Sequence, residues 1–446
     1  MKKLWEKGVS IDREIEDFTI GSDREVDLSL ARYDILGTMA HAAMLGSIGI
    51  LSEREQKDLK MELLHLYNKA AEGKFTIEPG VEDVHSQVEK ILTEKLGDTG
   101  KKVHTGRSRN DQVAVDLHLY IRDEIRKTAT GARDLFNALM MLAKENKDAL
   151  MPGYTHFQVA MPASFGLWFA SFAEDLTDDM ILLLAAFRVA DQNPLGAAAG
   201  FGTSIALNRQ LTTKLLGFES LRYNVMHAMM ARGRLEKITA QSLSSLAGTL
   251  ARLAMDVTLY MGQNHDFISF PEEYTTGSSI MPHKKNPDVF ELIRAKCNRI
   301  KALPMEIDLV ISGLPSGYHR DFQVLKENLM KAFSELQACL YMAEKVILKV
   351  RIRKDILDDP VYRHISSVDR VNQLVMAGRP FREAYQEVAR QIRQQTFVPE
   401  EKLTHTHEGS LGNLCLEDIQ RKMNERMGSF PFDRMDNAFR QLLEDS

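Results

Sequence analysis

Apolar residues recur in steps of three and four along several long stretches of the chain. In the proline-free segment 225–261, six of them follow this heptad-like spacing: Leu243, Leu246, Leu250, Leu253, Val257 and Tyr260. The spacing predicts a long helix that packs nearly parallel to its neighbours. A second stripe follows a Gly/Pro-rich turn at 312–317: Leu325, Leu329, Leu336, Leu340, Ala343, Ile347 and Val350. A third begins at Val113, and residues 165–189 are apolar on most faces, as in helices buried within a bundle or between subunits.

Few stretches alternate apolar and β-branched residues as strands do. The pattern therefore predicts an all-α protein whose centre is a bundle of long helices. Breaks in the helical pattern fall at about 72–112, 151–162, 191–204, 271–288 and 312–321. From about residue 355 the periodicity shortens. We predict three domains: an N-terminal helical domain at 1–105, a central long-helix bundle at 106–354 and a small C-terminal helical domain at 355–446.

Composition narrows the class of protein. The 446 residues carry a net charge of -5, which excludes a general basic surface for nucleic acid. The three cysteines are far apart and form no CxxC pair, which argues against a disulfide framework or a zinc site and favours a reducing compartment. No apolar run is long enough to span a membrane, and the N-terminus lacks the apolar core of a signal peptide. We expect a cytoplasmic protein with no nucleic-acid partner, no membrane partner and no metal.

Three of the breaks carry clustered polar residues. In HTGRSRNDQ, residues 104–112, Gly106 allows a tight turn, and donors precede a predicted helix, an arrangement that suits a carboxylate. In MPGYTHFQ, residues 151–158, His156 stands beside Thr155, and a lone histidine is more often structural. The third string, LPSGYHRDFQVLKEN, brings four polar side chains to the start of a helix: Tyr318, Arg320, Gln323 and Lys326. Taken singly, the first string is equally well explained as a solvated helix cap, and for the third string a solvated helix cap is the better interpretation.

The fourth string, GSSIMPHKKNP at 277–287, crowds polar and cationic residues into one short loop that Gly277 can hinge. An ordinary surface loop is the simplest interpretation. The composition also suits a loop that closes over an anionic substrate. Other chemistries lack their motifs, because the chain has no GxxxxGK[ST], no HExxH and no GxSxG, and the Gly-rich segment 196–204 follows no predicted strand. No cofactor is therefore expected.

Taken together, the four strings resemble one family. GSSIMPHKKNP resembles the signature of the fumarase, aspartase and argininosuccinate lyase superfamily, and HTGRSRNDQ and PGYTHFQ resemble its argininosuccinate lyase branch. The resemblance runs from a DxxLxxxD-like start at Asp27 to PFREAY in the C-terminal part. It implies a three-domain helical lyase that forms a homotetramer, with each active site drawing on three subunits. The implied reaction is the reversible cleavage of argininosuccinate to arginine and fumarate.

The resemblance also implies roles for individual residues. Ser278 is expected to be the base, His156 the acid that protonates the leaving nitrogen, and Glu291 the carboxylate that orients His156; the opposite assignment of acid and base stays open. Lys284 and Asn286 are expected to bind the carboxylate where charge develops. Further substrate-binding positions are expected at Ser108, Arg109, Asn110, Thr155, Tyr318, Gln323 and Lys326. A serine alkoxide needs nearby cations and backbone N–H donors, which Lys284 and a closed loop could supply.

The chain departs from the family pattern at several positions. Residues 6–9 differ from the GGRF of the family, and Asp23 stands where a substrate-contacting serine is usual, with Ser22 beside it. We expect the Asp23 carboxylate to pair with a cationic group of the arginine moiety. His283 replaces a common glutamine, as in adenylosuccinate lyases, so that branch is the alternative function, although TGRSRNDQ argues against it. A non-catalytic protein on this scaffold, like the related lens crystallins, is a further alternative that the complete set of expected catalytic residues disfavours.

Overall fold

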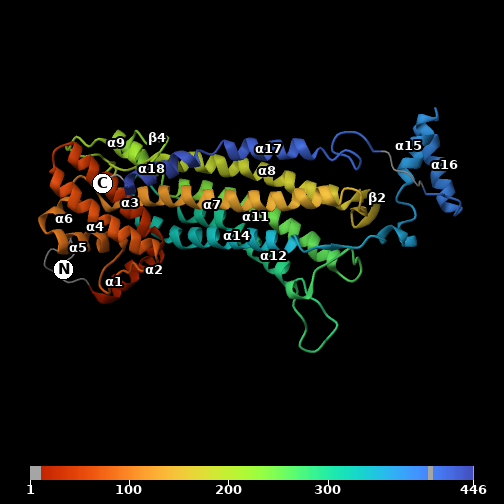
Figure 1. The fold of residues 1–446 in the computed structure, drawn as a ribbon, viewed down its shortest axis with the longest axis horizontal. Coiled ribbons are helices and arrows are strands. Elements are labelled where there is room, and N and C mark those ends of the chain that lie inside the picture. Colours follow the sequence, from red (N-terminus) through yellow and green to blue (C-terminus); the bar gives the residue numbers. More distant parts are fainter. Residues whose placement is uncertain (1–11, 400–404, 445–446) are drawn as a thin grey trace.

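Five helices run side by side through the middle of the molecule (Figure 1). They are α7 (Arg109–Glu145), α8 (Phe165–Ala190), α11 (Arg234–Met261), α12 (Asp288–Ile300) and α14 (Leu325–Ile347). The computed structural model describes residues 12–399 and 405–444, and the departure at residues 6–9 lies outside them. The predicted stripe of α11, from Leu243 to Val257, is buried at 0 to 2% exposure, so the periodic apolar residues form the bundle core. The all-α prediction is confirmed.

One predicted helix is interrupted. The segment 225–261 forms α10 (Val225–Met230) and then α11, with a break at 231–233. Gly233 has a φ of 76°, which a glycine adopts without the strain that a side chain would add. The Glu236 carboxylate accepts a hydrogen bond of 2.6 Å from the Gly233 N–H, which caps the new helix. The apolar spacing predicted α11 correctly but could not detect this break, because glycine alone does not end a helix.

Smaller helices gather at one end of the bundle (Figure 1). They are α1 (Arg13–Ile20), α2 (Asp23–Val26), η1 (Asp27–Leu30), α3 (Ala31–Ser47), α4 (Glu53–Ala71), α5 (Val84–Leu96), α6 (Asp98–Lys102) and α9 (Arg209–Leu215). Polar side chains cap several of them: for example, Ser52 forms a capping box on α4, and Asp83 accepts from the Ser86 N–H at the start of α5. Since α3 packs against both α4 and α7, this group of helices is joined directly to the bundle.

The opposite end of the bundle carries a β-hairpin, β1 (Leu150–Thr155) with β2 (Gln158–Ser164). Two further pairs of short strands occur: β3 (Gln192–Asn193) with β4 (Ser220–Leu221), and β5 (Ile268–Ser269) with β6 (Arg351–Ile352). The remaining short helices connect these parts: η2 (Glu272–Tyr274), α13 (Leu303–Val310), η3 (Arg320–Val324), η4 (Ile356–Asp358) and η5 (Pro360–Tyr362). No helix in the described ranges is both long and apolar enough to cross a membrane.

The helices of the C-terminal part of the chain lie in two separate regions of the molecule. Helices α15 (Ser367–Met376) and α16 (Phe381–Arg393) pack on each other beyond the hairpin, whereas α17 (Leu416–Gly428) returns along α8 (Figure 1). Helix α18 (Phe432–Glu444) ends against α9 and α3, close to the N-terminal helices. The domain boundaries at residues 105 and 354 stay predictions.

Candidate active site

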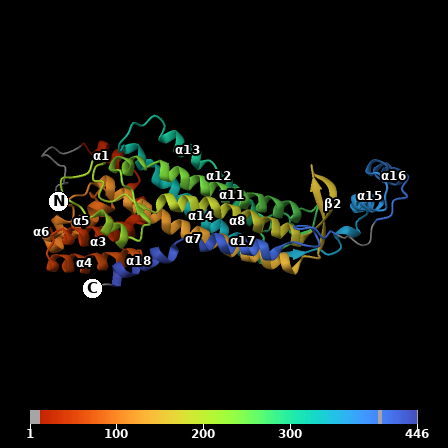
Figure 2. The ribbon, with the colours of Figure 1, turned by 90° about the horizontal axis from the view of Figure 1, so that it is seen from above.

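Six of the expected substrate-binding residues line one small cavity of about 80 Å³ at the N-terminal end of the bundle. They are Asp23, Arg109, Asn110, Tyr318, Gln323 and Lys326. They come from α2, from the beginning of α7 and from the segment around η3. Figure 2 shows why the last group arrives here, because the loop that follows α13 lies beside α1. We call this cavity the N-terminal pocket.

Lys326 lies between two carboxyl groups in the wall of the N-terminal pocket. Its side chain is 4% exposed, and its Nζ lies 2.5 Å from Asp27 Oδ1 and 2.9 Å from Asp23 Oδ1. Burial opposes the charge of Lys326, but the attraction of Asp27 and then Asp23 outweighs it and raises the lysine pKa. Burial, aided by Asp27, raises the pKa of Asp23 despite the lysine. Two carboxyl groups against one ammonium make this wall suited to a cationic group of a ligand.

Arg109 is held by the residues around the start of α5. Its Nη1 donates to Glu82 Oε2 at 2.8 Å and lies 3.1 Å from Asp83 Oδ2, while its Nη2 donates to Ser86 Oγ at 2.8 Å. The guanidinium therefore joins α7 to α5 across the pocket edge. Because three contacts fix the plane of the guanidinium, its position in the pocket depends on where α5 begins.

Ser108 caps α7. Its Oγ accepts from the Asn110 N–H at 3.3 Å, and its own N–H donates to Asp111 Oδ1 at 2.8 Å. Gly106, just before it, has a φ of 75°, which confirms the predicted tight turn, and a Cβ there would lie 2.9 Å from Leu207 Cδ2. The hydroxyl of Ser108 thus places Asn110 at the first turn of α7, facing the pocket.

Gln323 and Arg320 tie the η3 segment to α1. Gln323 Nε2 donates to the carbonyl oxygens of Thr19 and Ile20 at 2.9 and 3.0 Å, and Arg320 Nη2 donates to the Thr19 carbonyl at 2.6 Å. These bonds satisfy carbonyl groups at the C-terminal end of α1, which have no partner within the helix. They also bring Tyr318 to the pocket.

Sequence reasoning missed four charged residues that line the N-terminal pocket: Asp27, Glu82, Asp83 and Arg232. Asp27 could have been found from the sequence, because it opens the DxxLxxxD-like pattern. Arg232 is fully buried, donates to Glu236 Oε1 at 2.7 Å, and lies 5.8 Å from the centre of the Tyr318 ring. No local string marks Arg232, which lies in the break before α11 and reaches the η3 segment by donating from its Nη2 to the Phe322 carbonyl at 3.0 Å.

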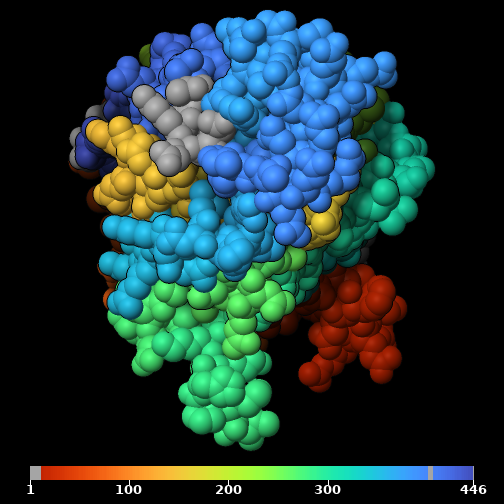
Figure 3. All heavy atoms as spheres, turned by 90° about the vertical axis from the view of Figure 1, so that its right-hand side faces the viewer, coloured from red at the N-terminus to blue at the C-terminus, as the bar shows by residue number. Residues whose placement is uncertain are grey.

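The expected base lies in a loop that stands out from the body of the protein, between η2 and α12 (Figures 1 and 3). The ends of the loop are joined, since the Asn286 N–H donates to the Thr276 carbonyl at 2.8 Å. Ser278 Oγ accepts from the N–H groups of Ile280 and Met281 at 3.3 and 3.1 Å. Such donors favour the charged form of an oxygen. Lys284 is exposed on the same loop.

The expected acid lies at the tip of the hairpin. His156 and Phe157 both have positive φ, 55° and 58°, between the paired residues Thr155 and Gln158. Two such residues make a type I′ turn, which normally uses Asn or Gly. The Pro-Gly pair that precedes His156 lies in β1 and takes no part in this turn. His156 and Thr155 are exposed.

Within one chain these groups lie far apart. Asn110 is in the first turn of α7, whose 37 residues span about 55 Å, and the hairpin follows the far end of that helix. Glu291 lies on α12 with its side chain half exposed, 3.8 Å from Arg294, and does not contact His156. One chain therefore presents three separate groups: the N-terminal pocket, the loop 277–287 and the hairpin tip.

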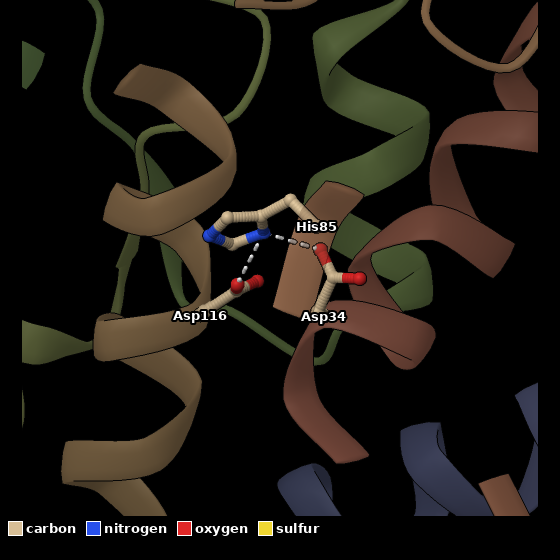
Figure 4. A group of neighbouring side chains, drawn as sticks. All are labelled: Asp34, His85 and Asp116. Carbon is tan, nitrogen blue, oxygen red and sulfur yellow. Dashed lines mark hydrogen bonds and ion pairs between the residues drawn. The ribbon is translucent and has the colours of Figure 1, made fainter. Parts of the chain in front are cut away.

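One buried cluster behind the pocket combines side-chain types found in metal sites. Among the described residues, Asp34, His85 and Asp116 have oxygen and nitrogen atoms close enough to share an ion (Figure 4). No local spacing in the sequence marks this cluster, since its three residues lie on three different helices.

The fold and the residues of the candidate site together indicate the class of protein. The family described as Lyase matches residues 7–302. The crystal structure of an EDDS lyase in complex with formate superposes with a TM-score of 0.76 at 21% identity, covering 98% of this chain and 94% of that one. A class II fumarase from Schistosoma mansoni superposes with a TM-score of 0.68 at 16% identity, covering 94% and 97%. The chain thus has the fold of the fumarate lyase superfamily.

Similarity at full length narrows the class. The argininosuccinate lyase of Parabacteroides distasonis is 52% identical over 442 residues, 99% of each chain. That of Xylella fastidiosa is 38% identical over 423 residues, 94% of this chain and 95% of its own. The chain belongs to the argininosuccinate lyase family, and the resemblance seen in the four strings is confirmed.

Proposed function

We propose that this enzyme catalyses the reversible elimination of argininosuccinate to L-arginine and fumarate, a step of arginine biosynthesis, in the cytoplasm. The observation that carries the proposal is the N-terminal pocket, where six residues expected from the resemblance converge in a chain 52% identical to a curated argininosuccinate lyase. The wall formed by Asp23, Asp27 and Lys326 suits the cationic groups of the arginine moiety.

The chemistry assigns one step to each catalytic residue. Ser278 takes the proton from the carbon beside a substrate carboxylate, and Lys284 with Asn286 stabilises the negative charge that develops there. The carbon–nitrogen bond then breaks, and its electron pair leaves with the nitrogen. The electron pair of the former C–H bond becomes the second bond of the fumarate double bond. His156, oriented by Glu291, gives a proton to the departing guanidino nitrogen. No redox change occurs, so the balance needs no further reactant.

The active form in this proposal is a homotetramer in which each site takes its three groups from three subunits. Two observations support it: the distance between the groups within one chain, and apolar side chains left exposed on the bundle. These exposed residues lie on α8, α11, α12, α13 and α14: Ile181, Leu182, Met255, Leu292, Met305, Leu309 and Tyr341.

An assay of fumarate release by ultraviolet absorbance tests the reaction. We expect release from argininosuccinate and none from adenylosuccinate. Release from adenylosuccinate alone would assign the chain to that branch, and release from neither would indicate a non-catalytic scaffold protein.

Subunit complementation tests the shared site. His156→Ala and Ser278→Ala proteins, each inactive alone, should regain activity when mixed and allowed to exchange subunits. Random mixing of equal amounts would complete both groups in about a quarter of the sites. Each variant taken through the same exchange with itself is the control. A fully active monomer in solution would disprove the assembly.

A further inference from the structure

Three helices meet at a buried histidine that the proposed reaction does not use. His85 from α5 directs its Nδ1 toward Asp34 Oδ1 of α3 at 2.8 Å and toward Asp116 Oδ2 of α7 at 3.4 Å (Figure 4). All three side chains are at most 3% exposed. We call these residues the Asp–His–Asp cluster.

The cluster needs a positive charge. Asp34 Oδ2, both Asp116 carboxylate oxygens and His85 Nε2 make no hydrogen bond within the part of the chain that the structure describes. Two buried carboxylates around a neutral imidazole would remain uncompensated, which is costly. Burial opposes charge on His85, but Asp34 and then Asp116 outweigh burial and raise its pKa to about 9. Both carboxyl groups meet the same ring nitrogen, so charge rather than hydrogen-bond geometry selects the imidazolium. Burial and then Asp34 raise the pKa of Asp116 well above its ordinary value, and His85 opposes that rise.

The N-terminal pocket is lined by the start of α7 and by residues just before α3 and α5. Asp27, in the η1 turn that leads into α3, lies seven residues before Asp34, and Arg109 lies seven residues before Asp116 on α7. On α5, His85 lies between Asp83 and Ser86, which hold Arg109. The cluster is thus a second layer directly behind the layer that faces the substrate.

We propose that His85 is a positioning residue whose imidazolium ties α3, α5 and α7 together and so places Asp27 and Arg109 in the pocket. The inference rests on the proposed function. His85 contacts no substrate in this proposal; it acts through the helices that carry the binding groups. Its loss should therefore affect binding of the non-reacting end of the substrate more than the chemical step.

A divalent cation is a less suitable occupant of this place. Arg107, half-buried beside the cluster and donating to Thr38 Oγ1 at 2.9 Å, already directs positive charge toward Asp34 and Asp116. With His85 protonated, two cations face two carboxylates. A dication that displaced the proton would add charge to a balanced site.

Charge-matched variants of the full-length enzyme test the proposal. His85→Gln removes the cation and should raise KM for argininosuccinate about tenfold or more, with kcat within about threefold of wild type. The double variant His85→Gln/Asp116→Asn removes one charge of each sign, so its KM should lie closer to the wild-type value than that of the single variant. Asp116→Asn alone is the matched control.

Several results would overturn the proposal. An unchanged KM in His85→Gln is one. Another is a double variant whose KM is no lower than that of His85→Gln, which would indicate that the shape of the ring matters and its charge does not. If His85→Gln does not fold, recovery of folded, active protein in the double variant supports the proposal, and failure to recover contradicts it. Stoichiometric divalent metal in purified wild type, lost in Asp116→Asn, would replace the imidazolium with a metal site. Wild type without fumarate release would instead defeat the proposed function itself.

Discussion

The ammonium of Lys326 lies 2.9 Å from the carboxylate of Asp23, at a position where the family usually has a serine. The lysine is also paired with Asp27, so Asp23 adds a second carboxyl group to a wall that one ammonium already balances. Burial, with Asp27, raises the pKa of Asp23 despite Lys326, so the charged form of this carboxyl group carries a desolvation cost in the pocket. A cationic group of the substrate would repay that cost.

Replacing Asp23 tests this recognition. Asp23→Ser restores the usual residue but removes the carboxylate, and a lost charged hydrogen bond is worth about 1.5–3 kcal/mol. KM for argininosuccinate should rise about tenfold or more while kcat changes little. Ser22→Ala is the neighbouring control, because Ser22 donates to Glu327 Oε2 at 3.0 Å. An unchanged KM in Asp23→Ser would place the arginine moiety elsewhere.

The periodic apolar pattern was sufficient for the bundle, because helices packed on two sides must repeat apolar residues every three to four positions. It could not reveal the break at Gly233 or the hairpin turn at His156 and Phe157. Both depend on positive φ, which the apolar pattern does not encode. The turn carries two non-glycine residues where Asn and Gly are usual, so turn rules would have rejected it.

The N-terminal pocket shows a different limit. The resemblance supplied Asn110, Gln323 and Lys326, because the strings that carry them are recognisable when the four are taken together. Arg232 and the Asp–His–Asp cluster have no such string, and tertiary packing alone brings them together.

The hairpin tip provides a test of the acid. His156→Asn keeps a residue that tolerates positive φ, so the turn should persist. Turnover should fall by about 10²–10⁴-fold, the usual contribution of a general acid. Phe157→Gly, at the other turn position, is the control and should keep activity near wild type. Near wild-type turnover in His156→Asn would show that this histidine is structural.

Two adjacent serines test the base. Ser278 Oγ accepts two backbone N–H bonds, whereas the structure shows no such bonds to the Ser279 hydroxyl within its described residues. Ser278→Ala should bind argininosuccinate with near wild-type affinity, measured by calorimetry, and cleave it about 10²–10⁴-fold more slowly. Ser279→Ala should be affected far less. Equal losses in both variants, or an active Ser278→Ala, would exclude the first serine as the base.

The adjacent lysines of the same loop differ in their contacts. Lys285 lies 3.0 Å from Glu272, while Lys284 is exposed and available to a substrate carboxylate. Lys284→Met should lower kcat and raise KM, each by about tenfold or more, because the lysine would serve both binding and the developing charge. Lys285→Met, the matched control, should change neither by more than about threefold. The reverse order of effects would transfer the role to Lys285.

The charge of His85 predicts how stability depends on pH. Its folded pKa, about 9, lies above the ordinary value of 6.5, so the imidazolium stabilises the fold fully below about pH 6.5. That contribution, on the order of 3 kcal/mol, falls as pH rises and is lost above about pH 9. The charged groups that act on the ring are Asp34 of α3, Asp116 of α7 and Asp83, the N-cap residue of α5. Arg107, two residues before α7, acts on Asp34 and Asp116.

The thermal midpoint measured between pH 6.5 and 9.5 should therefore fall more in wild type than in His85→Gln/Asp116→Asn. That double variant lacks the imidazole of residue 85 and the carboxylate of residue 116. It retains every other group that titrates over this range. Subtracting the two curves isolates the histidine from the lysines, tyrosines and cysteines. Parallel curves would mean that His85 is neutral in the folded protein, and the buried carboxylates would then have to be protonated or held by another cation.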